Sequence, residues 1–156
     1  MTGKDADIIV SLRDENNMAW DTIALETGYS LRNVKQTYKA RKEGKVYLDE
    51  AFQHLKDNYD LSRITISESL KIVNDFGVKV CWNTWHHFIN DQKIPLKGTQ
   101  LWRDNLMSAL LERVQNGEDF DATYNEIYGE FYTKNSLNKF RPEVKRYFVI
   151  FKVIER

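Results

Sequence analysis

The stretch Trp20–Lys42 reads WDTIALETGYSLRNVKQTYKARK and has the spacing of two short helices joined by a tight turn. Ile23 supplies an apolar side chain for a core, and Ala24 is small enough for the next helix to cross close to it. Four residues later, Gly28 can adopt the left-handed backbone that ends a helix. Ser30 can cap the following helix with its hydroxyl, and Val34 returns to the shared core. The stretch therefore predicts helices at about 19–27 and 31–42 that pack together.

Helical periodicity extends through the rest of the 156-residue chain and predicts an all-α fold. Further helices are expected at 5–16, 48–58, 65–76, 80–89, 100–114 and 119–131, and another begins at about residue 135. The stretch 142–156, PEVKRYFVIFKVIER, is ambiguous. Pro142 suits a helix start, whereas the dense apolar run after it favours a strand, so a short β or helical segment is expected there.

A weak internal repeat indicates how these helices are grouped. At a constant offset of 55 residues, five positions of the segment 72–85 match apolar or asparagine residues of 127–140. They are Ile72, Phe76, Trp82, Asn83 and Trp85, which align with Ile127, Phe131, Leu137, Asn138 and Phe140. Gly28 lies a similar distance before Gly77. The repeat predicts three tandem three-helix units, at 1–45, 46–98 and 99–156, whereas apolar residues at helical spacing are also what plain helical bundling requires.

The charges are balanced overall but unevenly distributed. The chain carries 23 basic and 23 acidic residues, so no global attraction to nucleic acid or to an anionic membrane is expected. Between residues 31 and 45, however, six basic side chains stand against Glu43 alone. Residues 132–156 hold seven basic side chains against two acidic ones, and residues 112–130 are acidic. Both basic segments fall where third helices are expected.

The sequence resembles the helix-turn-helix DNA-binding family in about 20 of its residues. The resemblance rests on Ile23, Ala24, Gly28, Ser30 and Val34. The tandem arrangement is similar to that of small bacterial or phage transcription regulators. The resemblance implies that the helix 31–42 lies in the major groove of double-stranded DNA while the helix before it crosses the phosphate backbone.

Burial of one face of the helix 31–42 turns a polar and basic face outward. Arginine can pair with a guanine edge, and glutamine or asparagine with adenine, so Arg32, Asn33 and Gln36 are candidates for reading bases. Lysine is suited to phosphates, where charge alone is needed. The complete predicted DNA-binding set is Ser30, Leu31, Arg32, Asn33, Lys35, Gln36, Lys39, Arg41 and Lys42. A solvated basic face is the alternative.

The second and third units offer fewer candidates. By the alignment, Asn83, His86 and His87 in the second unit, and Asn138, Lys139 and Arg141 in the third, occupy positions that correspond to this face. The second unit is aromatic rather than basic, with Trp82 and Trp85 near the histidines. A protein-binding role is therefore an alternative to DNA binding for that unit.

Enzymatic and metal-binding functions find little support in the sequence. Cys81, His86 and His87 do not supply convergent zinc ligands, because adjacent helical residues point about 100° apart. No glycine-rich phosphate loop, nucleophile elbow or histidine triad occurs. We therefore expect no catalytic residue, no metal and no cofactor. A single cysteine, the absence of a signal-peptide pattern at the start and the lack of a long apolar run favour a soluble cytoplasmic protein.

The basic helix and the family resemblance together predict a sequence-specific double-stranded DNA-binding protein that is not an enzyme. The resemblance further implies that it is a transcriptional regulator, and we expect a repressor. Two other functions fit the same residues. One is an adaptor or inhibitor that grips a polymerase or a nuclease, and the other is an accessory DNA-binding component of a packaging or recombination machine.

Overall fold

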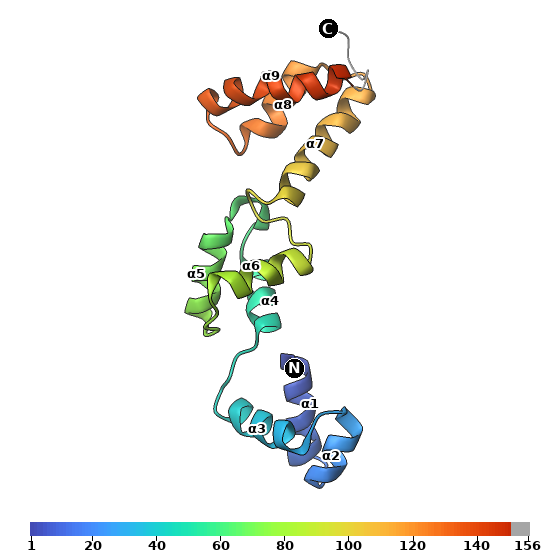
Figure 1. The fold of residues 1–156 in the computed structure, drawn as a ribbon, viewed down its shortest axis with the longest axis vertical. Helices are drawn as coiled ribbons and strands as arrows, with labels where there is room; N and C mark the ends of the chain where they lie inside the picture. Colours follow the sequence, from blue (N-terminus) through green and yellow to red (C-terminus); the bar gives the residue numbers. More distant parts are fainter. Residues whose placement is uncertain (151–156) are drawn as a thin grey trace. The chain divides into compact units, whose positions relative to one another are not determined.

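The structure, a computed structural model, describes residues 1–150 as a series of helices (Figure 1). Their bounds are α1 Gly3–Asp14, α2 Trp20–Thr27, α3 Leu31–Lys42, α4 Leu48–Asn58, α5 Ile66–Phe76, α6 Trp82–Asp91, α7 Gln100–Gln115, α8 Phe120–Gly129 and α9 Lys134–Ile150, with a short 3₁₀ turn at Leu61–Arg63. Within residues 1–150 no strand forms, and one isolated bridge joins Thr65 to Lys97. The predicted all-α fold is therefore confirmed.

The chain divides into two compact units. The first contains residues 1–60 and 67–86, and the second contains residues 61–66 and the chain from residue 87 onward, so that the division runs through α6. The first unit includes the whole of the predicted segment 1–45. The finer division into three units, at 1–45, 46–98 and 99–156, stays a prediction.

In the first unit, α1, α2 and α3 pack against one another (Figure 1). Ile9, Ile23 and Val34 are completely buried where the three helices meet, one from each helix. Gly28 ends α2 with φ at 75°, and its N–H donates to the Ala24 carbonyl at 3.0 Å. The Ser30 hydroxyl caps α3 by accepting from the Asn33 N–H at 3.2 Å. The local turn chemistry therefore sets the angle at which α3 leaves α2.

The same unit continues through α4, α5 and the first residues of α6. Leu55 and Val73 are completely buried, and His54 on α4 stacks on Phe76 on α5 with ring centroids 4.3 Å apart. Trp85 is also completely buried, and its Nε1 donates to Ser69 Oγ at 2.8 Å. The indole thus combines apolar packing with a satisfied polar atom.

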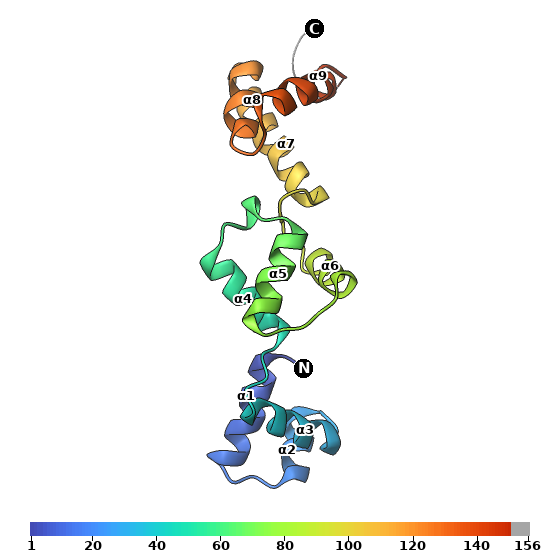
Figure 2. The same cartoon turned by 90° about the vertical axis from the view of Figure 1, so that its left-hand side faces the viewer.

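In the second unit, α8 packs against both α7 and α9 (Figure 2). The core contains Leu110 and Val114 from α7, Phe120, Tyr124 and Tyr128 from α8, and Val144 and Phe148 from α9. The carboxylate of Asp119 caps α8 by accepting from the Ala122 N–H at 3.0 Å. Trp102 ties α7 to the 3₁₀ turn Leu61–Arg63 by donating from Nε1 to the Ser62 carbonyl at 2.9 Å.

A ladder of aromatic rings at intervals of four residues runs along α8 and continues to Tyr132, three residues past its end. Phe120 stacks on Tyr124, Tyr124 on Tyr128 and Tyr128 on Tyr132, with centroids 5.9, 4.7 and 6.1 Å apart. Residues four apart lie on the same face of a helix, which brings these rings together. We call these four residues the aromatic ladder.

The carboxyl-terminal helix differs from the sequence expectation. Pro142 does not start a new element but lies inside α9, which continues from Lys134 to Ile150. Proline lacks the N–H that would reach the carbonyl of Asn138, so the helix loses one hydrogen bond there. Both Asn138 and Pro142 are exposed residues. The alternative of a strand is thus wrong for residues 142–150, and residues 151–156 lie outside the described residues.

The proposed repeat is only partly reflected in the turns. Gly28 and Gly77 both have positive φ, at 75° and 125°, after α2 and α5. Between α8 and α9 no described residue has a positive φ, and Gly129 is the last residue of α8 itself. The third turn is therefore built differently from the first two.

None of the helices within residues 1–150 combines the length and the apolar character needed to cross a membrane.

Candidate nucleic-acid interface

α3 is held by one face and presents the other to solvent. Val34 and Thr37 are its buried residues, and they anchor the helix against α1 and α2. Tyr38 is half-buried and packs edge-on against Trp20, with ring centroids 5.1 Å apart. These contacts leave the opposite face of α3 uncovered within its own unit.

The uncovered face contains most of the predicted DNA-binding residues. Arg32, Lys35, Gln36 and Lys39 are exposed and spaced at i, i+3, i+4 and i+7, which places them on one side of the helix. In the described part of the chain, no hydrogen bond or ion pair engages any of these four side chains. Ser30, Leu31 and Asn33 are also exposed, at the amino end of α3.

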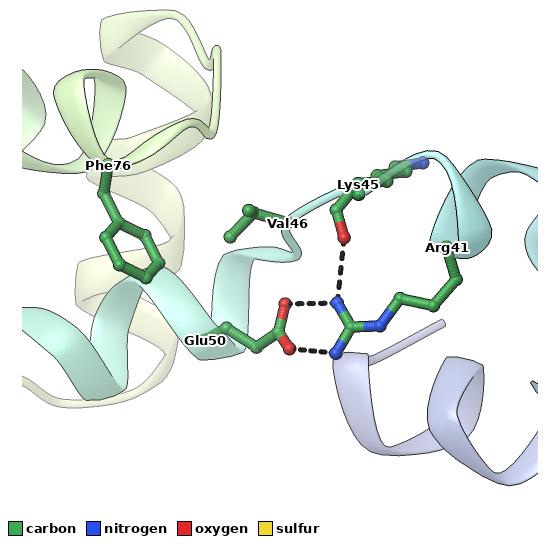
Figure 3. Close-up of a pocket in the computed structure, with 6 residues that line it drawn as sticks. Arg41, Lys45, Val46, Glu50 and Phe76 are labelled. Carbon is green, nitrogen blue, oxygen red and sulfur yellow. Dashed lines mark hydrogen bonds and ion pairs between the residues drawn. The ribbon is translucent and has the colours of Figure 1, made fainter.

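Arg41, by contrast, is held inside the unit (Figure 3). Its guanidinium forms a bidentate ion pair with Glu50 on α4, contacts Asp7 on α1 at 2.9 Å, and donates to the Lys45 carbonyl at 2.8 Å. The Arg41 side chain is 19% exposed. The hydrogen bonds that Arg41 donates to Glu50 and then to Asp7 raise the pKa of Arg41, and the hydrogen bond from Arg41 lowers the pKa of Glu50. We call Arg41, Asp7 and Glu50 the clamp, because they join α3, α1 and α4.

Lys42 is also paired, although it is more exposed. Its ammonium lies 2.8 Å from the carboxylate of Asp14, which also accepts from the Tyr38 hydroxyl at 2.5 Å. The hydrogen bonds from Lys42 and then Tyr38 lower the pKa of Asp14, and Asp14 in turn raises the pKa of Lys42. Of the five cations of α3, Arg32, Lys35 and Lys39 therefore have their charge uncompensated by a neighbouring carboxylate.

α2 brings no positive charge to this surface. Its charged residues are Asp21 and Glu26, both of them exposed. A helix with this composition does not attract phosphates through its side chains, so contacts to a DNA backbone would fall to α3.

The candidates of the predicted second unit lie on α6. Asn83 and His87 are exposed, and His86 stacks on Trp82 with ring centroids 4.6 Å apart. Trp82 is the first residue of the helix and is 46% exposed. The structure therefore places an aromatic surface, rather than a basic one, on α6.

The candidates of the predicted third unit lie on α9, and two of them interact with each other. Arg141 donates to Asn138 at 3.2 Å and to Asn125 on α8 at 2.5 Å, and its guanidinium lies over the ring of Tyr124. Lys139 is exposed, with its ammonium 5.7 Å from the ring of Phe140. Arg141 thus serves the packing of α9 on α8.

No three His, Cys, Asp or Glu side chains within residues 1–150 converge in a way that could hold a metal ion. The Cys81 sulfur lies 3.2 Å from the Thr84 hydroxyl, within the same turn.

No family model, curated protein or solved structure matches this chain. The proposals below therefore depend on the geometry of the sites.

The sequence did not reveal the clamp. Glu50 lies nine residues after Arg41, across the turn at Gly44, and Asp7 lies 34 residues before it. Helical periodicity relates residues three or four apart, so it carries no signal for such contacts. The sequence pattern therefore predicts Arg41, a basic residue near the end of α3, as a phosphate contact. In the structure, the carboxylates of Asp7 and Glu50 bind it.

Proposed function

We propose that this protein binds double-stranded DNA sequence-specifically through α3 and, as its resemblance suggests, regulates transcription as a repressor. The observation that carries the proposal is the uncovered face of α3, where Arg32, Lys35, Gln36 and Lys39 have no intramolecular partner within residues 1–150. A helix fixed by Val34 and Thr37 can present this face to the major groove without rearrangement.

The residues of this face divide into two roles. Arg32 can donate two hydrogen bonds to a guanine edge, and Gln36, one turn later, can pair with adenine, as can Asn33 beside them. Lys35 and Lys39 match phosphates, for which a mobile point charge is sufficient. Ser30 and Leu31 stand at the amino end of α3, the end of a recognition helix that approaches the bases.

Arg41 and Lys42 already form ion pairs within the protein, so they contribute less to the proposed DNA-binding surface. Arg41 and Lys42 would have to leave Glu50, Asp7 and Asp14 in order to contact phosphates. We therefore assign Arg41 to the scaffold that holds α3, and we treat Lys42 as a secondary phosphate contact.

The direct test is selection from random double-stranded DNA with the full chain, followed by gel-shift titration of the enriched sequences. An enriched motif that Arg32→Ala no longer distinguishes from random DNA is the expected result. Failure to enrich any motif, at low as well as at ordinary salt, would rule out sequence-specific recognition. A reporter gene placed behind the selected site then separates repression from activation.

The exposed aromatic surface of α6 favours a second candidate, an adaptor that binds another protein. Tryptophan is enriched where protein interfaces are energetically strongest, and Trp82 is accessible. This function predicts a partner that co-purifies with the wild-type chain and is lost with Trp82→Ala, while Arg32→Ala has no effect on its recovery. The opposite pattern, with DNA binding lost only in Arg32→Ala, would support α3 as the interface.

A further inference from the structure

The second unit contains a groove between α7 and α9, on a surface that the proposed DNA contacts do not use. Two adjoining hollows, of about 440 and 690 Å³, share Arg103, Met107, Glu143 and Tyr147 in their linings. Each hollow falls within the roughly 300–1,000 Å³ that small-molecule sites occupy. All of the lining residues belong to the second unit, so the groove is a property of that unit alone.

The walls of the smaller hollow are apolar and aromatic. Leu106 and Met107 line it from α7, and Tyr132, Phe140 and Val144 line it from the other side. The apolar side of α7 is broad: Leu110 and Val114 are buried, while Met107 and Leu111 are partly buried against the same core and also line the groove. The part of this apolar side that its own chain leaves half-covered can pack against an apolar ligand.

Tyr128 contributes a hydroxyl to the lining of the smaller hollow. The residue is only 6% exposed, and no hydrogen bond to its hydroxyl is found in the described part of the chain. A molecule bound in the hollow could accept a hydrogen bond from this hydroxyl. Burial raises the pKa of Tyr128, so the hydroxyl keeps its proton and can donate.

Two opposite charges border the same hollow. Arg103 on α7 and Glu143 on α9 both line it, and among residues 1–150 neither forms an ion pair with another group. Of the other charged groups lining the groove, Asp104 accepts from Gln100 at 2.8 Å. A ligand that carried only one charge would satisfy Arg103 or Glu143 and be repelled by the other, whereas a zwitterion satisfies both.

We propose that this groove binds a free α-amino acid with an aromatic side chain. Its carboxylate meets Arg103 and the Tyr128 hydroxyl, its ammonium meets Glu143, and its ring lies among Met107, Tyr132 and Phe140. A helix of a partner protein fits less well, because its backbone groups are bonded internally and offer neither a carboxylate to Arg103 nor an ammonium to Glu143.

The test is calorimetric titration of the full chain with four probes that separate the parts of the ligand. L-Phenylalanine carries the ring and both charges, 3-phenylpropanoate lacks the ammonium, 2-phenylethylamine lacks the carboxylate, and glycine lacks the ring. L-Phenylalanine should bind at least about tenfold more tightly than each of the other three, the ratio expected when a contact worth about 1.4 kcal/mol is missing.

Three variants then assign the contacts. Arg103→Gln and Tyr128→Phe should each weaken L-phenylalanine about tenfold and leave 2-phenylethylamine unchanged, whereas Glu143→Gln should weaken L-phenylalanine and leave 3-phenylpropanoate unchanged. Arg146→Gln and Glu112→Gln are controls with the same change of charge on exposed positions of α9 and α7 outside both hollows. Both controls should bind like the wild type.

Three results would overturn the proposal. The first is the absence of any heat with L-phenylalanine up to about 10 mM, well above a millimolar Kd. The second is binding that Arg103→Gln and Tyr128→Phe leave unchanged while circular dichroism shows both variants folded. The third is a dimer by light scattering that Arg103→Gln dissociates, since a second copy would then cover the groove.

Discussion

Gly28 holds the one backbone conformation on which the angle between α2 and α3 depends. Its φ of 75° lies in the left-handed region, and a Cβ built there would have no atom within 4 Å. Gly28→Ala should therefore lower the free energy of unfolding by about 1–2 kcal/mol through backbone strain alone. Chemical denaturation monitored by circular dichroism measures this difference.

Gly129 provides the matched control for that substitution. It has helical backbone at the end of α8, and a Cβ there would meet Leu137 at 3.9 Å, an ordinary contact. Gly129→Ala should be neutral or raise the free energy of unfolding by about 0.4–1 kcal/mol. Equal destabilisation by the two alanines would show that loss of glycine itself, not the φ of 75°, is responsible.

Arg32 is the residue on which sequence discrimination should depend most. Arg32→Ala should cost about 1–3 kcal/mol in binding to the selected DNA and relax the preference at one base pair. Arg32→Lys retains the charge but loses the paired donors, so it should keep affinity for random DNA while losing most of the discrimination. Gel-shift titrations against the selected and a scrambled duplex check both. An unchanged preference in Arg32→Lys would mean that Arg32 contacts only phosphates.

At the scale of helices, the clamp fixes the carboxyl end of α3 to two neighbouring helices. Arg41 reaches Glu50 at the start of α4 (Figure 3). It also reaches Asp7 on α1, and the Gly3 N–H donates to Asp49 at 3.0 Å. Carboxylates at the start of α4 thus bind both the end of α3 and the start of α1. The position of the proposed recognition helix therefore depends on residues outside the α2–α3 motif.

The clamp predicts an acid-sensitive contribution to stability. Because the pKa of Glu50 is lowered in the folded state, its contribution is complete above its ordinary pKa of about 4.3 and is lost as the pH falls through the lower, folded-state value. A double-mutant cycle with Arg41→Gln and Glu50→Gln should give a coupling of about 1 kcal/mol at pH 7 that disappears in strong acid. Urea unfolding of the four proteins at each pH provides the values.

The exposed pair Arg63–Glu130, 3.3 Å apart with both side chains more than half exposed, serves as the reference cycle. Its coupling should be no more than a few tenths of a kcal/mol at pH 7. A clamp coupling no larger than this reference would contradict the role assigned to Arg41.

The helices and turns that could be predicted are those whose determinants lie within four residues. Gly28 and Ser30 act on their own turn, and the bounds predicted for α3 agree with those observed. The clamp and the groove could not be predicted, because they depend on contacts between residues such as Arg41 and Asp7 that are distant in sequence.

At the scale of the whole molecule, the balanced charge limits how DNA binding can depend on salt. With no net charge, attraction has to come from local basic surfaces, and on the proposed α3 face it comes chiefly from Lys35 and Lys39. Each phosphate contact contributes about 0.9 to the slope of log K against log salt, so Lys35→Ala and Lys39→Ala should each make the slope shallower by roughly that amount. Fluorescence anisotropy at several salt concentrations measures the slope.

Lys4 supplies the control for these two lysines, since it is exposed on α1 and its loss changes the net charge equally. Lys4→Ala should leave the slope unchanged. If all three variants shift the slope alike, binding follows the overall charge and not the face of α3.

The aromatic ladder also gives the second unit an intrinsic spectroscopic signal. Three of its four members are tyrosines stacked nearly parallel, and Tyr132 lies 5.9 Å from the ring of Trp102. Chromophores this close couple their electronic transitions, so tyrosine excitation should pass to the indole and the stacked rings should give a strong near-ultraviolet dichroic band. Folding of α8, or a molecule placed beside Tyr128, can therefore be followed in the unlabelled protein.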